Sequence, residues 1–328
     1  MFHSALKISR RTLIRSSLVG AVAAPFFRPQ WAIAQESVEG RDLLKDKRPV
    51  LHPDGSKFGV YDPYGDFKDE KGVATEHLFL PWEDVDLKPL AEADSYARAR
   101  GRNILITIEP WSWALEWNVS RQQLRDNILS GRRDANMRAI LKVVQNFQSP
   151  ITIRWAQEME NPYGRFTWSN WKPEDYINAF KRMFGIIREM SPNAQVMWSP
   201  RGEKNLVNYY PGSEYVDLVG LTVLGYEAFD VIEYGKPRTF AESLKQGYDL
   251  TVGYGKPIWV AELGYVGGLD YLKSWVQDVT LAYAQYPELK EVVYFNDREV
   301  WPWPHNLGRP NWRVVPGTPE SSYSTRRR

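Results

Sequence analysis

The stretch Ile151-Thr-Ile-Arg-Trp-Ala-Gln-Glu-Met-Glu-Asn161 begins as an apolar, β-branched run and ends in polar residues. This pattern is typical of a buried β-strand. Glu158 stands where that strand is expected to stop. A second stretch, Lys256-Pro-Ile-Trp-Val-Ala-Glu-Leu-Gly264, has the same form and carries Glu262 at its expected end. Two carboxylates at the carboxyl ends of buried strands predict an active site at the mouth of a barrel.

The rest of the chain alternates strand-like and helical stretches. Strands are expected at Lys57–Tyr61, Thr75–Leu80, Asn103–Ile108, Ile151–Trp155, Ala194–Trp198, Tyr215–Leu221 (continuing to about Leu224), Pro257–Ala261 and Glu291–Phe295. Helical spacing is found at Leu87–Arg100, Asp134–Phe147, from Pro173 onward, at Thr239–Tyr248 and at Leu269–Tyr286. Eight strands alternating with helices predict an α/β fold, a single (β/α)8 barrel over residues 57–315. An open, doubly wound sheet is the alternative, but no glycine-rich phosphate loop follows the first strand.

Composition excludes several kinds of chemistry. The 328 residues include no cysteine, so disulfides, thiolate nucleophiles and zinc–thiolate sites are ruled out. Four histidines, at positions 3, 52, 77 and 305, lack the spacing of a metal site. We therefore expect no metal and no cofactor. A net charge of +2 gives no support for a nucleic-acid or membrane partner.

The N-terminus has the three features of an export signal in order. Ser9-Arg10-Arg11-Thr12-Leu13-Ile14 is a twin-arginine pattern, Ser16–Phe27 is a mildly apolar run, and Ala32-Ile33-Ala34 is a small-x-small cleavage site. Residues 1–34 are thus expected to be removed from a periplasmic or secreted bacterial protein, with no permanent membrane anchor because the apolar run is short. A chance basic N-terminus is the alternative. Residues 35–56 are interpreted as an irregular leader and 316–328 as a disordered tail.

The fourth and seventh strands of such a barrel lie on opposite sides of its mouth. Their ends can hold two carboxyl groups about 5 Å apart, the separation used by retaining glycosidases. In that reading Glu158 is the general acid/base and Glu262 the nucleophile. A salt bridge at the barrel rim is the structural alternative for either residue taken alone.

The sequence also resembles glycoside hydrolase family 26, from about Gly59 to Val314. The motifs that carry the resemblance are Ile106–Trp111, Asn127–Asp134, Arg154–Met159, Trp198–Pro200, Tyr210–Gly212, Tyr215–Leu221, Lys256–Gly264 and Asn311–Val314. The family includes β-mannanases and related β-glucanases of a clan with catalytic glutamates on strands four and seven. The resemblance implies a retaining mechanism, with Glu158 as acid/base and Glu262 as nucleophile.

Two departures from the family pattern affect the expected site. Family members usually read His-Glu-Met-Asn-Gly where this chain has Gln157-Glu158-Met159-Glu160-Asn161. Gln157 can still donate from its amide but cannot change charge. The clan's tyrosine beside the nucleophile falls near Leu224, which has no hydroxyl. Tyr226, two residues on and on the same side of a strand, is the expected substitute, and the alternative is that the nucleophile lacks such a tyrosine.

Further substrate-binding candidates lie at or just past the strand ends. Tryptophans are expected to stack on sugars or to close the barrel top, and the candidates are Trp111, Trp168, Trp198, Trp301 and Trp303. Arg154 lies inside a strand and must be paired, either to order one of the two glutamates or as a structural ion pair. Glu109 can bind a sugar hydroxyl or form an ion pair at the rim.

These features favour an exported, retaining endo-β-glycanase acting on a β-1,4-linked mannan or a mixed-linkage β-1,3/1,4-glucan. Aromatic residues at the barrel top and the absence of a basic groove fit a neutral polysaccharide as the partner. A non-catalytic glycan-binding barrel, accessory to polysaccharide synthesis or export, is the alternative, motivated by Gln157 and Leu224. The retention of both glutamates argues against it.

Overall fold

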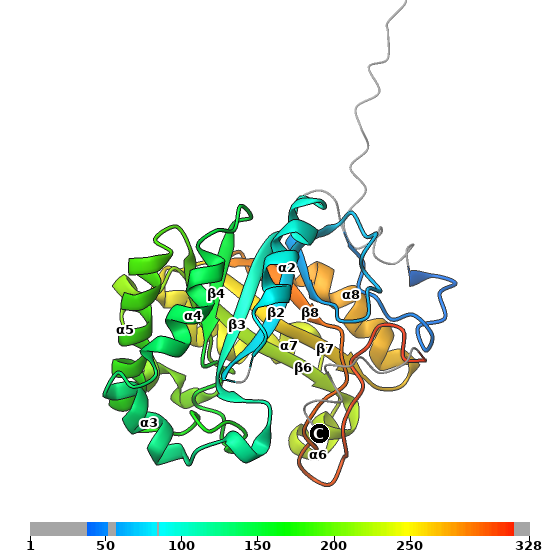
Figure 1. Ribbon diagram of the computed structural model, residues 1–328. Coiled ribbons are helices and arrows are strands. Elements are labelled where there is room, and N and C mark those ends of the chain that lie inside the picture. The colour runs from blue at the N-terminus through cyan, green and yellow to red at the C-terminus, as the bar shows by residue number, and fades with distance from the viewer. Residues whose placement is uncertain (1–37, 52–56, 84, 318–328) are drawn as a thin grey trace, which may run out of the picture.

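A computed structural model describes residues 38–51, 57–83 and 85–317. Its centre is a closed barrel of eight parallel strands that follow one another in sequence order (Figure 1). The strands are β1 (Lys57–Tyr61), β2 (Val73–Glu83), β3 (Asn103–Ser112), β4 (Ile151–Trp155), β5 (Gln195–Trp198), β6 (Leu218–Tyr226), β7 (Ile258–Val266) and β8 (Leu289–Phe295). β8 pairs with β1 over all five residues of β1 and closes the barrel. The predicted (β/α)8 barrel is confirmed, and the open sheet is excluded.

Helices surround this barrel, with α3, α4 and α5 on one side and α8 on another (Figure 1). They are α2 (Lys88–Arg98), α3 (Arg121–Leu129), α4 (Asp134–Val144), α5 (Pro173–Met190), α6 (Glu227–Tyr234), α7 (Phe240–Thr251) and α8 (Leu269–Gln285). Pro173 begins α5, and Thr239 caps α7 in a capping box with Glu242, as their sequence positions indicate. The sequence analysis missed α3 and α6, although Ser120 and Gln123 form a second capping box at the start of α3.

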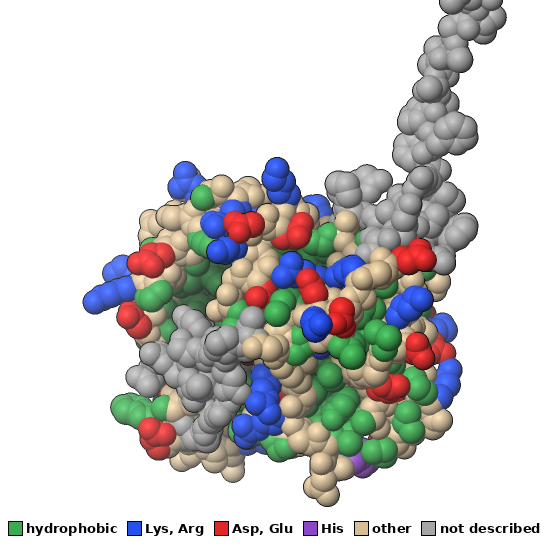
Figure 2. Space-filling view, turned by 90° about the vertical axis from the view of Figure 1, so that its right-hand side faces the viewer, with side chains coloured by type: hydrophobic (Ala, Val, Ile, Leu, Met, Phe, Trp, Pro, Cys, Tyr) green, Lys and Arg blue, Asp and Glu red, His purple; other side chains and the backbone are tan. Residues whose placement is uncertain are grey.

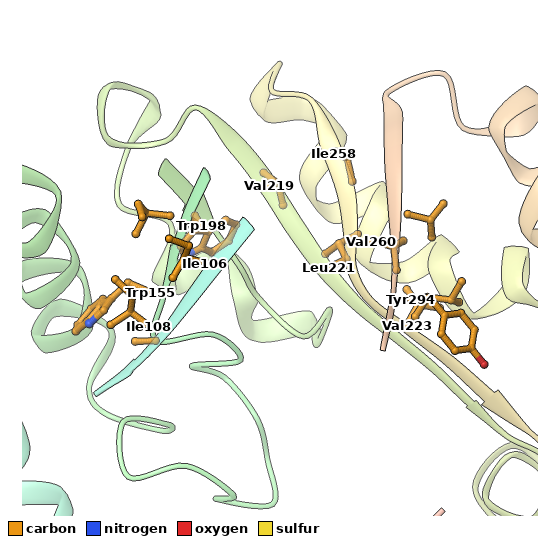
Figure 3. Close-up of a cluster of buried hydrophobic side chains, with 14 of the residues drawn as sticks. Ile106, Ile108, Trp155, Trp198, Val219, Leu221, Val223, Ile258, Val260 and Tyr294 are labelled. Carbon is orange, nitrogen blue, oxygen red and sulfur yellow. The ribbon is translucent and has the colours of Figure 1, made fainter. Parts of the chain in front are cut away.

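Alternation along the strands divides the core into two layers. One set of strand side chains faces the helices, and Figure 3 shows part of it, including Ile106 and Ile108 of β3, Trp155 of β4 and Val260 of β7. The second set forms a separate cluster without helix residues and fills the barrel interior. Its members are Leu105, Met197, Leu218, Trp259, Ala261 and Val293. The barrel is therefore a packed core, and an active site can form only at its mouth.

Several strands run further than the sequence predicted. β2 continues through Pro81 to Glu83, because β1 pairs with β2 only as far as Glu76 and a proline is tolerated where one neighbour is missing. β7 continues to Val266, so Glu262 lies within its strand and not at its end. This corrects the predicted position. The pairing of β7 with each of its two neighbours is nevertheless irregular near Glu262. The register with β6 shifts at Leu221/Thr222, and the register with β8 shifts between Val260 and Leu263. Such irregularities re-aim side chains near active sites.

The described part of the expected leader, residues 38–51, lies against the barrel. Leu43 is buried in the main core, and the Lys47 ammonium donates to the Tyr265 carbonyl oxygen at 2.7 Å. Burial lowers the pKa of Lys47 to about 7. The expected export signal and nearly all of the expected tail lie outside the described residues.

One face of the molecule carries mixed charge (Figure 2). On the face shown in Figure 2, lysine and arginine side chains are interspersed with aspartate and glutamate. Within the described ranges, no helix is long and apolar enough to cross a membrane. No group of three or more His, Asp or Glu side chains among these same residues is placed to hold a metal ion.

Candidate active site

Glu158 lies in a tight turn that follows β4. Ala156 and Glu158 both adopt left-handed backbone conformations, with φ of 49° and 54°. Side chains other than glycine rarely accept this conformation, and it is concentrated at functional sites. The turn is fixed by a hydrogen bond from the Glu158 amide to the Ser199 carbonyl oxygen at 2.8 Å. The Asn161 amide donates to Glu158 Oε2 at 2.8 Å, so the nearly buried carboxylate is held in one orientation.

Glu262 is paired with Arg154, whose side chain is fully buried. Arg154 Nη1 donates to Glu262 Oε1 at 2.6 Å, while 13% of the Glu262 side chain remains exposed. The arginine is itself fixed by the hydroxyls of Ser199, 2.7 Å from Nε, and Thr107, 3.2 Å from Nη1. Of the roles expected for Arg154, the structure therefore supports ordering of Glu262.

The protonation of Glu262 reflects opposing influences. Burial raises the pKa of its carboxyl group, and the nearby negative charge of Glu158 acts in the same direction. The Arg154 guanidinium opposes both by charge and by its hydrogen bond. The net pKa remains above the ordinary glutamate value. The pairing with Arg154 thus favours the ionised form that a nucleophile requires.

Glu109 accepts hydrogen bonds from three side chains at the end of β3. Its donors are Trp113 Nε1 at 2.7 Å, Trp111 Nε1 at 3.1 Å and Gln157 Nε2 at 3.1 Å. Gln157 is buried, and its amide oxygen has no hydrogen-bond partner among the described residues. The sequence expected Glu109 to bind a sugar or form an ion pair. Glu109 lines the space beside the catalytic candidates and anchors two indole rings there, and its binding of a sugar hydroxyl stays a prediction.

The expected tryptophans divide into two groups. Trp111 and Trp301 line the space beside the two glutamates, and Trp303 lines a neighbouring cleft together with Trp301. Trp168 and Trp198 are fully buried and do not line either space. Trp168 packs against Trp111 and Phe166, and Trp198 lies against two tyrosines. The stacking role predicted for these two is corrected, because no ring face is open to a sugar.

Tyr226 is not placed as the substitute hydroxyl. Its phenol donates to the Leu307 carbonyl oxygen at 3.0 Å, and its ring packs on Trp303. Leu224 lines both spaces beside the glutamates, as its alignment with the clan's tyrosine implies. The site therefore has a leucine side chain where the clan's pattern has a tyrosine hydroxyl.

The sequence analysis missed two further charged features. Arg165, from the segment after β4, forms an ion pair with Glu299, after β8, in which the carboxylate is buried and the arginine side chain is partly exposed. Burial opposes ionisation of Glu299, but the Arg165 charge and hydrogen bonds hold its pKa below the usual value. No local pattern signals such a pair between segments that are 134 residues apart.

Glu160 is the second missed feature. It is almost fully buried, and its Oε1 accepts from the amides of Gly202 and Glu203 at 2.9 and 3.3 Å. Burial raises its pKa to about 7. The signal was available, because Glu160 stands where the family pattern has asparagine. This carboxyl group ties the turn after β4 to the segment after β5.

Two adjacent spaces, which share lining residues, lie at this mouth. A cleft of about 570 Å³ is lined by Glu158, by Leu221–Leu224 of β6, and by residues of α6, α7 and the segment after β8. A small chamber of about 30 Å³ is lined by both Glu158 and Glu262. Glu158, Arg165, Leu224 and Trp301 line both. The two carboxylates thus share one chamber that opens beside a much larger cleft.

A parallel barrel with glutamates after β4 and on β7 that line one chamber has an arrangement typical of glycoside hydrolases. Comparison with known proteins agrees. The model of glycosyl hydrolase family 26 matches residues 122–237, a segment that contains Glu158. The resemblance to this family, inferred from the sequence motifs, is confirmed.

Two relatives found by sequence comparison are named β-1,3-xylanases. A β-1,3-xylanase from a Vibrio species is 29% identical over 132 residues, and one from an Alcaligenes species is 29% identical over 146 residues. These alignments cover 37% and 42% of this chain but only 27% and 30% of the relatives.

Among solved structures, a family 26 β-mannanase from Bacteroides ovatus has a TM-score of 0.56 at 16% identity, covering 91% of both chains. A modular endo-β-1,4-mannanase from Cellulomonas fimi has a TM-score of 0.60 at 15% identity, covering 83% of this chain and 69% of the other. At these identities the likeness establishes the fold.

Proposed function

We propose that this chain is an exported, retaining β-glycanase that hydrolyses a neutral β-linked polysaccharide. The observation that carries the proposal is the shared chamber lined by Glu158 and Glu262. The sequence favours a β-1,4-mannan or a mixed-linkage β-glucan, and the named relatives add β-1,3-xylan as a third candidate. The tryptophans at the mouth supply flat apolar surfaces that suit an uncharged sugar.

In this mechanism Glu262 attacks the anomeric carbon while Glu158 gives its proton to the departing glycosidic oxygen. The C–O bond to the leaving sugar breaks as the ester bond to Glu262 forms. Glu158, now ionised, takes a proton from water, and the resulting hydroxide displaces Glu262 from the anomeric carbon. Arg154 supports the first step by favouring ionised Glu262, and Asn161 supports both by fixing the Glu158 carboxylate.

Alanine variants of the two glutamates test this division of labour. Glu262→Ala is expected to abolish turnover, because the covalent step has no other nucleophile. Glu158→Ala should nearly stop hydrolysis of a polysaccharide but still react with an aryl β-glycoside whose leaving group needs no proton. The glycosyl-enzyme then accumulates, and azide should release it as a β-glycosyl azide. Wild-type turnover of polysaccharide by both variants would refute the assignment.

A glycan-binding protein without hydrolytic activity is the second candidate. Leu224 at the position of the clan's tyrosine and the small volume of the chamber favour it. Reducing-sugar release from a panel of mannan, mixed-linkage β-glucan and β-1,3-xylan distinguishes the two. Binding to one polymer with no release from any would establish the binder.

A further inference from the structure

The two spaces at the mouth differ in which catalytic candidate they reach. The small chamber is lined by both glutamates, whereas the large cleft is lined by Glu158 and not by Glu262. The sugar being cleaved must therefore lie where the spaces join, at Arg165 and Trp301, which line both. The remaining sugars of the chain must extend from that point in one or both directions.

The retaining mechanism distinguishes the two directions in which the sugar chain can extend, because the nucleophile and the acid act on different sugars. The nucleophile bonds to the anomeric carbon of the glycone, the sugar on the non-reducing side of the cut. The acid protonates the oxygen of the aglycone, which carries the reducing end. A space that reaches the acid but not the nucleophile is therefore the aglycone side. The cleft of about 570 Å³ takes that role, and the chamber of about 30 Å³ is what remains on the glycone side.

Resting on the function proposed above, we propose that this glycanase cuts one sugar at a time from the non-reducing end of its substrate. The endo action expected from the sequence would need room for two or more glycone sugars. The chamber on the glycone side has a volume of about 30 Å³, far below the volume of about 570 Å³ of the cleft on the aglycone side, so little room remains there beyond the sugar at the junction. Only the sugar at the junction can be accommodated.

The wall that closes the glycone side is held in place by several contacts. Trp111 and Trp113 both donate to the buried carboxylate of Glu109. Trp111 also packs edge-to-face on the fully buried Trp168 at a ring separation of 4.9 Å. The wall is therefore built on β3 and supported by core residues, so a second glycone sugar cannot displace it at low cost.

The aglycone side, in contrast, offers open aromatic surfaces. Tyr163 and Tyr234 line the cleft and are 52% and 49% exposed. Each has an arginine over its ring, with Arg201 5.4 Å from the Tyr163 centroid and Arg238 3.6 Å from that of Tyr234. These contacts hold the rings in place beside the path of the leaving chain. Sugars beyond the cleavage point can stack there.

A reducing-end-labelled hexasaccharide of whichever glycan is hydrolysed tests the proposal. Exo action predicts that the first labelled product is the pentasaccharide, with an equal amount of free monosaccharide. A mixture of shorter labelled products from the start would overturn this inference and leave the proposed hydrolysis intact. Failure to cleave any glycan would instead contradict the proposed function.

Variants on the two sides give an independent test. Trp113→Ala should open the glycone wall, so that disaccharide joins the first products, whereas Trp117→Ala, a 63% exposed tryptophan of the same segment, should leave the products unchanged. Tyr234→Ala should raise KM for the hexasaccharide by several-fold without changing KM for an aryl monoglycoside. If Trp113→Ala does not fold, an unchanged KM ratio in Tyr234→Ala would still contradict the placement of the aglycone.

Discussion

Arg154 shows how a single buried charge can control the chemistry of its neighbour. Arg154 belongs to the barrel strand β4, and its side chain is fully buried. Its guanidinium donates to three oxygen atoms, one each from Ser199, Thr107 and Glu262. A buried cation of this kind is stable only when it is paired. Burial and the charge of Glu158 raise the pKa of Glu262, and the charge and hydrogen bond of Arg154 limit that rise.

Replacement of Arg154 by methionine, which removes the charge, should therefore change the pH dependence. Glu262 must be ionised to attack, so activity falls as pH drops through its pKa. Without Arg154 that pKa rises further, and the acid limb of the kcat/KM profile should move to higher pH. Arg138→Met, which breaks an exposed ion pair with Glu189, is the matched control and should leave the profile unchanged. An acid limb that stays in place in Arg154→Met would contradict the assigned role.

At the scale of elements, α8 packs closely against the extension of β6 and β7 beyond the barrel. β6 and β7 remain paired beyond the barrel proper, as far as Tyr226 and Val266. α8 packs its fully buried Trp275 on this extension, and the indole donates to the Arg238 carbonyl oxygen at 2.8 Å. Gly225 lies directly beneath that ring.

A side chain at Gly225 should consequently be costly. A Cβ atom there would lie 2.2 Å from Trp275, and the ring cannot move without losing its hydrogen bond and its packing. Gly225→Ala is expected to lower the free energy of unfolding by about 1–3 kcal/mol, measured by urea denaturation. Gly253→Ala, where no atom lies within 4 Å, should change it by less than about 0.5 kcal/mol. Equal stability of the two variants would show that α8 can shift freely.

At the scale of the whole molecule, the expected export signal stays a prediction, because residues 1–34 lie outside the described part of the chain. If the twin-arginine interpretation is right, N-terminal sequencing of periplasmic or secreted protein should begin near Gln35. Lysine at both Arg10 and Arg11 should leave the protein in the cytoplasm, as cell fractionation would show. Exported protein that begins with Met1 would contradict the prediction.

The sequence by itself determined the barrel and its two glutamates. Apolar β-branched runs indicate burial of consecutive residues, so the eight strands could be predicted from local pattern, as could the two strands that bring Glu158 and Glu262 to the mouth. The exact place of Glu262 could not, because β7 continues past it to Val266. Gln157 and Leu224, also identified in advance, lie at the site as expected.

Tertiary structure alone decided which rim side chains line the spaces at the barrel mouth. Trp168 and Trp198 follow strand ends just as Trp111 and Trp301 do, yet the first two are buried and the others line the chamber. The cause lies in contacts between segments far apart in sequence, such as Arg165 with Glu299 and the residues that enclose each indole. Exposure at a barrel mouth depends on how its loops pack together, and periodicity within one segment carries no information about that packing.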